Sequence, residues 1–111
     1  MKTPEQARIT SWFRYPGRRW FIGRARLYAD HLALAGWSWR GREAQRIPLR
    51  DVDEVKWYRT GRLVLRLRDG HAVSIEIDGS GLWKFALEEA LGRRLTVCEQ
   101  LPEHVSRASA A

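Results

Sequence analysis

Apolar residues recur at every second position on both sides of Asp69-Gly70, and arginines alternate with them over 62–68. The alternating apolar residues are Leu63, Leu65, Leu67, Val73, Ile75 and Ile77. A period of two is typical of a strand with one buried face, and Asp69-Gly70 between the two runs predicts a hairpin with a two-residue turn. This hairpin is the strongest local signal in the sequence.

The apolar spacing becomes helical directly after the hairpin. One stripe runs over 80–91 and contains Trp83, Ala86, Leu87, Ala90 and Leu91. Asp78-Gly79-Ser80 offers an N-cap before the stripe, and Gly92 is placed to end the helix in the left-handed conformation. We therefore expect a helix from Ser80 to Leu91 that caps the sheet.

Five further strand-like segments precede the hairpin, at about 8–15, 18–28, 31–37, 43–49 and 52–59. Tyr15-Pro16-Gly17-Arg18 has Pro and Gly where a type II turn needs them. Gly23 lies where the apolar phase of its segment changes, which predicts a β-bulge. The short connections favour antiparallel neighbours. After the helix, Leu95–Cys98 is expected either to add a short edge strand or to lie across the barrel.

The length of 111 residues fits one domain. We expect a flexible N-terminus over 1–7, a single domain over 8–98 and a disordered tail over 99–111. The lone cysteine, Cys98, excludes an internal disulfide and fits either a reducing compartment or a secreted domain that does not use disulfides. The start of the chain lacks the pattern of a signal peptide, and no apolar run is long enough to cross a membrane. We expect a cytoplasmic protein, free in solution or peripheral to a membrane.

Two motifs in a fixed order carry a resemblance. The run Ile47-Pro48-Leu49-Arg50-Asp51-Val52-Asp53-Glu54-Val55 has the form I-P-L-x-x-(I/V)-x-x-V. The preceding run from Arg26 to Leu34 is similar to G-x-L-x-(L/I/V)-T-x-x-x-L-x-L, with Asp30 near the place where Thr often stands. With the strand pair and helix that follow, the sequence from about Gly23 to Leu91 resembles the bacterial pleckstrin-homology-like (PH and GRAM-type) domains.

This resemblance implies a mainly β fold, a bent antiparallel sheet or barrel of about seven strands capped by one C-terminal α-helix. It also implies a binding module for lipid head groups, phosphopeptides or other proteins. The aromatic-rich segment 8–22 departs from the shortest members of the family, so the resemblance does not fix how that segment pairs.

A net charge of +7 favours anionic partners. Tryptophan and arginine alternate in the 37–42 loop, where an apolar wedge and bidentate anion donors come together. The candidate anion or membrane contacts are Trp39, Arg40, Arg42, Arg62, Arg66 and Arg68, the last three forming a row opposite the leucines of 62–68. The plainer interpretation places Trp37 in the core and the arginines on a solvated surface.

Aromatic residues crowd the first hairpin, and an exposed cluster of this kind marks a protein contact or a homodimer. The candidates are Trp12, Phe13, Tyr15 and Trp20. We expect the partner to be a protein or an anionic lipid surface, with nucleic acid on the Arg- and Trp-rich surface as the alternative.

Catalytic and metal-binding patterns are missing from the sequence. His31, His71 and His104 have no metal-ligand spacing to one another or to Cys98. The acidic cluster at Asp51, Asp53 and Glu54 fits the solvated start of a strand. We therefore expect no enzymatic activity, cofactor, metal or small-molecule substrate.

Overall fold

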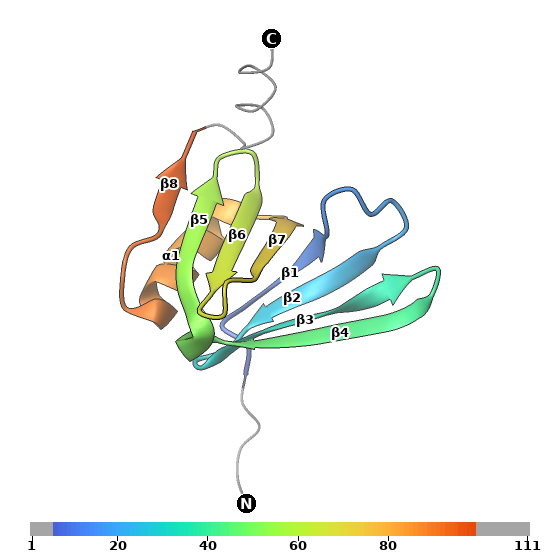
Figure 1. The fold of residues 1–111 in the computed structure, drawn as a ribbon, viewed down its shortest axis with the longest axis horizontal. Coiled ribbons are helices and arrows are strands. Elements are labelled where there is room, and N and C mark those ends of the chain that lie inside the picture. Colours follow the sequence, from blue (N-terminus) through green and yellow to red (C-terminus); the bar gives the residue numbers. More distant parts are fainter. Residues whose placement is uncertain (1–5, 100–111) are drawn as a thin grey trace, which may run out of the picture.

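The computed structural model describes residues 6–99, which contain eight strands, a short 3-10 helix and one α-helix (Figure 1). In chain order these are β1 (Ile9–Arg14), β2 (Ile22–Leu27), β3 (His31–Ser38), β4 (Gly41–Pro48), η1 (Leu49–Asp51), β5 (Val52–Tyr58), β6 (Arg62–Leu67), β7 (Ala72–Ile77), α1 (Ser80–Leu91) and β8 (Thr96–Cys98). The predicted mainly β fold with one C-terminal helix is confirmed. The predicted flexible start (1–7) and disordered tail (99–111) lie almost wholly outside the described residues. His104 lies outside them as well.

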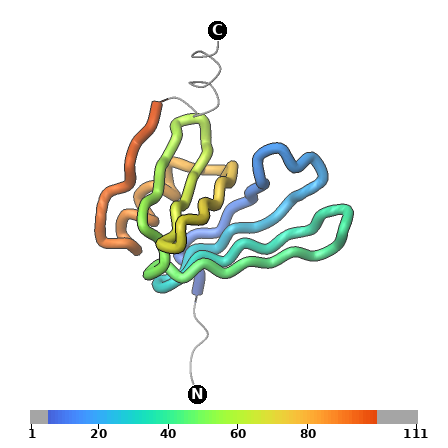
Figure 2. Tube along the Cα trace, viewed as in Figure 1, coloured from blue at the N-terminus to red at the C-terminus, as the bar shows by residue number. Residues whose placement is uncertain are grey.

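All eight strands belong to one sheet with the order β4-β3-β2-β1-β7-β6-β5-β8. Neighbouring strands are antiparallel, except that β8 pairs in parallel with the edge of β5. β1 pairs with β7 only through Phe13↔Ile77 and Arg14↔Glu76. Beyond this short junction the two halves, β1–β4 and β5–β8, run in different directions (Figure 2).

The inward-facing side chains of both halves form one core with Trp83 and Leu87 of α1. Trp83 is fully buried, and its indole N–H donates a hydrogen bond to Ser11 Oγ of β1 at 2.9 Å. Trp57 of β5 donates its indole N–H to the carbonyl oxygen of Ser80 at 2.9 Å. The helix is thus hydrogen-bonded to both halves of the sheet.

The helix has the predicted bounds, and the prediction of its C-terminal cap is confirmed while that of its N-terminal cap is not. Gly92 ends it with a φ of 72°, as expected. The expected side-chain N-cap is wrong, because Gly79 occupies the cap position and no side chain accepts a capping hydrogen bond from the first N–H groups of the helix.

The β6–β7 hairpin forms as predicted, but its turn is one residue longer. The Gly70 N–H donates to the carbonyl of Leu67, and the Leu67 N–H donates to that of His71. Three residues therefore lie between the closing pair, with Gly70 at a φ of 96°. A turn that ends on a left-handed glycine is the common three-residue hairpin loop.

The β-bulge predicted at Gly23 is wrong. The register of β2 runs without a shift through Gly23, which pairs with Phe13 on one side and Gly36 on the other. Gly23 is an inward position like Ala25, so the apolar phase does not change there. A Cβ at Gly23 would come within 2.7 Å of the Phe13 ring, and the glycine therefore makes room for an aromatic side chain.

Candidate binding surface

The hairpins β1–β2 and β3–β4 extend beyond the β5–β8 half of the sheet, and their turns lie at the same end (Figure 1). We call residues 12–23 and 36–43 the arm. Gly23 and Gly36 pair directly on its inner face. A Cβ at Gly36 would come within 2.6 Å of Gly23 Cα and 2.7 Å of a Phe21 ring carbon. The two glycines therefore form a flat floor beneath the Phe21 ring, which also contacts the rings of Phe13 and Tyr15.

An ion pair joins the two hairpins beside this aromatic cluster. The Arg18 guanidinium donates two hydrogen bonds to the Glu43 carboxylate, at 3.0 and 2.5 Å. It also lies 5.4 Å from the Tyr15 ring centroid and 5.0 Å from that of Phe21. The hydrogen bond from Arg18 is the main reason why the pKa of Glu43 falls to about 2. Aromatic packing and this ion pair together hold the arm in one shape.

The outward-facing residues of β1–β4 form a basic, tryptophan-containing surface, which we call the outer face. The strand register arranges it in three rows: Ile22–Trp37–Arg42, Trp12–Arg24–Ala35–Ala44 and Thr10–Arg26–Ala33–Arg46. Trp12, Ile22 and Trp37 are 48%, 59% and 63% exposed. The Arg24 guanidinium lies 4.4 Å from the Trp12 ring centroid. Alanines leave a low floor between the larger side chains.

The outer face carries an excess of positive charge. None of its outward-facing strand residues is acidic. Within residues 6–99, Arg24, Arg26, Arg42 and Arg46 have no carboxylate at ion-pair distance. Guanidinium groups bind carboxylates in bidentate fashion, and exposed tryptophans offer large apolar contact area. The face can therefore bind an anionic partner that also has apolar groups.

The end of the arm continues this surface. Trp39 in the β3–β4 turn is 76% exposed, and Trp20 in the β1–β2 loop is 75% exposed. The Arg40 guanidinium lies 5.0 Å from the Trp39 ring centroid. Trp37 is exposed too, so its expected place in the core is wrong. The structure thus brings Trp39, Arg40 and Arg42 together at one tip.

The arginine row predicted on β6 lies elsewhere and is largely paired. Arg62 approaches Glu76 at 3.8 Å, and Arg66 approaches Asp53 at 2.9 Å. Arg68 lies beyond the end of β6, in the turn. Four strands separate β6 from β4 in the sheet order, so this row does not join the tip of the arm.

The four aromatic candidates of the first hairpin lie in different places: Phe13 and Tyr15 on the inner face, Trp12 on the outer face and Trp20 in the β1–β2 loop. Phe13 is buried and Tyr15 is half-buried in the inner aromatic cluster, so neither ring is free for a contact, which corrects that part of the prediction. Trp12 and Trp20 are exposed, as the contact hypothesis requires.

Sequence reasoning missed four of the large side chains of the outer face: Ile22, Arg24, Arg26 and Arg46. The first three follow one another at every second position of β2. This alternation was a usable signal for a solvent-facing basic strand, but the supposed bulge at Gly23 obscured it.

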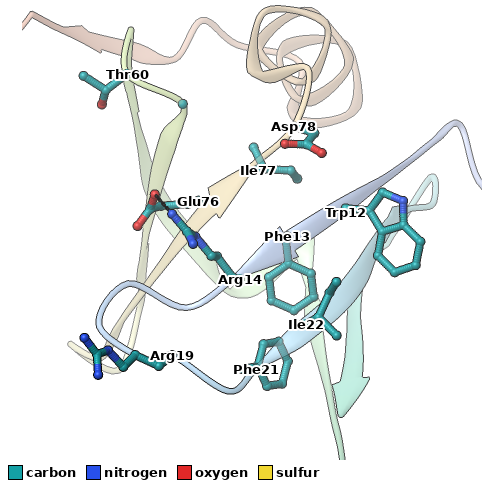
Figure 3. A pocket seen from close by; sticks show the side chains of 11 residues that line it. Trp12, Phe13, Arg14, Arg19, Phe21, Ile22, Thr60, Glu76, Ile77 and Asp78 are labelled. Carbon is teal, nitrogen blue, oxygen red and sulfur yellow. Dashed lines mark hydrogen bonds and ion pairs between the residues drawn. The ribbon is translucent and has the colours of Figure 1, made fainter. Parts of the chain in front are cut away.

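A cleft of about 490 Å³ borders the outer face at the β1–β7 junction (Figure 3). Trp12 and Ile22 line one side, and the Arg14–Glu76 ion pair lies on the other. No histidine or cysteine lines the cleft. In the described part of the chain, no three His, Cys, Asp or Glu side chains are grouped to hold a metal. Because it shares Trp12 and Ile22 with the outer face, the cleft forms a rim of that surface.

A scan against protein-family models finds no match to this sequence, and a search of curated proteins finds none either. Among residues 6–99, no helix is long and apolar enough to cross a membrane.

Proposed function

We propose that this protein is a non-enzymatic PH-like binding module whose outer face binds an acidic protein partner. The observation that carries the proposal is the combination of exposed Trp12, Ile22 and Trp37 with four arginines that have no ion-pair partner among residues 6–99 and no acidic residue among the outward-facing strand positions. Tryptophan and arginine are the residues that most often dominate the energetics of protein interfaces. Unpaired guanidinium groups favour an acidic partner and disfavour a basic one.

The order of the elements supports the PH-like part of the proposal. A four-strand meander, a three-strand meander and one helix follow one another along the chain. The resemblance implied about seven antiparallel strands followed by one C-terminal capping helix, and these elements agree with that expectation. Fold alone does not select a ligand, so the choice of an acidic protein depends on the outer face.

Nucleic acid is less well supported as the partner. That alternative joined Trp39, Arg40 and Arg42 to the arginines of β6 as one phosphate-binding surface. The two groups lie on separate parts of the sheet, and acidic neighbours already neutralise Arg62 and Arg66.

An anionic membrane is a second candidate, favoured by the tip of the arm. Trp20 and Trp39 project there with Arg40 close by. Tryptophan is enriched at the membrane–water interface, and basic residues attract acidic head groups. Sedimentation with vesicles that contain or lack anionic lipid tests this candidate. If the wild type sediments with anionic vesicles and Trp39→Ala does not, the membrane replaces the acidic protein as partner.

Titration of the ¹⁵N-labelled protein with poly-L-glutamate tests the main proposal. We expect chemical-shift changes confined to β1–β4. Reversal of two outer-face charges, Arg24→Glu with Arg26→Glu, should weaken binding at least about tenfold. The matched control, Arg68→Glu with Arg94→Glu, changes the net charge equally but lies away from the outer face. Equal weakening by both pairs would mean that only net charge matters, and the proposed surface would be wrong.

A further inference from the structure

The sheet has one long open edge in the described part of the chain. Its two outermost strands are β8 with three residues and β4 with eight. An edge strand presents unpaired backbone N–H and C=O groups that can pair with another extended segment. β4 is therefore the place where a partner can extend the sheet.

The register fixes which backbone groups of β4 are free. Ser38 and Gly41 form the last pair before the two-residue turn, so they are a hydrogen-bonded pair of the ladder. Bonded and non-bonded pairs then alternate along β4. Arg42, Ala44 and Arg46 consequently direct their N–H and C=O groups away from β3, toward the open edge.

The same three residues direct their side chains to the outer face, where all three are exposed. A second copy of the chain fits this edge poorly in the register centred on Ala44, because antiparallel pairing there places Arg42 opposite Arg46 of the other copy. Like charges directly opposite each other destabilise a strand pair. A strand with acidic residues at those positions is the complementary occupant.

We propose that β4 binds an extended segment of the partner as an added strand, with the pattern acidic-x-apolar-x-acidic. The two acidic side chains pair with Arg42 and Arg46. The apolar side chain between them covers Ala44 and Ala35, where the floor of the outer face is low. Pro48 has no N–H and limits the pairing at one end. This inference rests on the proposed function and adds the conformation and the sequence pattern of the partner.

The probe is a fluorescein-labelled peptide, Thr-Glu-Thr-Leu-Thr-Glu-Thr, measured by fluorescence anisotropy. Its control has the same sequence with N-methyl groups on the amides that face β4, which keeps the charge and removes the hydrogen bonds. We expect N-methylation to weaken binding at least about tenfold, because two or more backbone hydrogen bonds are lost. Amide hydrogen exchange at Arg42, Ala44 and Arg46 should slow when the unmodified peptide is bound.

Ala44→Pro provides the matching test in the protein. The Ala44 N–H does not bond to β3, and edge strands tolerate proline, so we expect an unchanged fold by NMR. Proline removes the central donor of the open edge and should weaken peptide binding by about tenfold or more, whereas Ala44→Ser should leave it within about twofold.

The outcomes separate this inference from the proposed function. If both peptides bind equally, Ala44→Pro has no effect and the Arg24→Glu, Arg26→Glu pair abolishes binding, then the outer face binds acidic partners without strand addition. If neither the peptide nor poly-L-glutamate binds, both proposals fail. Self-association of the Arg42→Ala, Arg46→Ala variant without any peptide binding by the wild type would mean that these arginines only protect the edge.

Discussion

Gly36→Ala should destabilise this protein, although alanine normally strengthens a strand relative to glycine. The added Cβ has no free space, because the backbone carbonyl of Ile22 and the Cα of Gly23 lie against it. The third neighbour is a Phe21 ring carbon at 2.7 Å, which is well inside van der Waals contact. Two of the three obstacles are backbone atoms, so a change of rotamer cannot relieve the overlap.

The expected magnitude follows from two opposing terms. Replacement of glycine restricts the unfolded chain, which favours folding by about 0.5–1 kcal/mol. Overpacking in a closely packed region costs about 1–3 kcal/mol and sometimes more. Since β2 and β3 must separate to accept the methyl group, we expect the upper part of that range, and a net loss of about 2 kcal/mol. This loss corresponds to a urea midpoint about 1 M lower.

Urea unfolding followed by tryptophan fluorescence and far-UV circular dichroism measures this effect. Gly81→Ala is the matched control, because nothing lies within 4 Å of the added Cβ and the residue is in the first turn of α1. We expect this control to be up to about 1 kcal/mol more stable than the wild type. A Gly36→Ala variant as stable as the wild type would refute the glycine floor and the account of how the arm is held.

Three further predictions each concern one local feature of the structure. The folded pKa of Glu43, about 2, lies below its ordinary value of 4.5. The ion pair with Arg18 therefore stabilises the fold fully above about pH 4.5 and loses this effect as the pH falls through 2. An NMR titration of the Glu43 carboxyl should show a midpoint near 2, and Arg18→Ala should move that midpoint toward 4.5. Trp83→Phe should cost about 2–4 kcal/mol in thermal unfolding, against about 1 kcal/mol for Ser11→Ala, because it loses buried volume as well as the hydrogen bond. Gly92→Ala should cost about 1 kcal/mol in urea unfolding, since its φ of 72° strains any residue with a Cβ.

The parts of the fold that depend on local signals could be predicted from the sequence. The helix from Ser80 to Leu91 is bounded as expected, because apolar spacing and Gly92 act within a few residues of one another. The β6–β7 alternation also placed the correct residues inward. The turn between those strands was one residue too short in the prediction, because Asp-Gly fits both a two-residue turn and the last two residues of a three-residue turn.

The binding surface could not be predicted because its members meet only through strand pairing. Trp12, Arg24 and Ala44 lie on three different strands, and their common row depends on the register of the whole β1–β4 meander. Trp37 illustrates the same limit. A tryptophan next to a turn more often packs against a core. Only the pairing of Gly36 with Gly23 shows that Gly36 faces inward and that Trp37 faces outward.

The arm explains how so many large aromatic side chains can be exposed without loss of the fold. Its inner face is continuous with the core, and rings packed on two glycines and the Arg18–Glu43 pair hold the two hairpins together. The outer-face tryptophans and arginines are not part of this inner packing, and they are available for a partner. Substitutions on the two faces of the arm should accordingly have different effects. Inner-face changes should lower the free energy of unfolding, while outer-face changes such as Arg24→Glu should leave it nearly unchanged and act on binding alone.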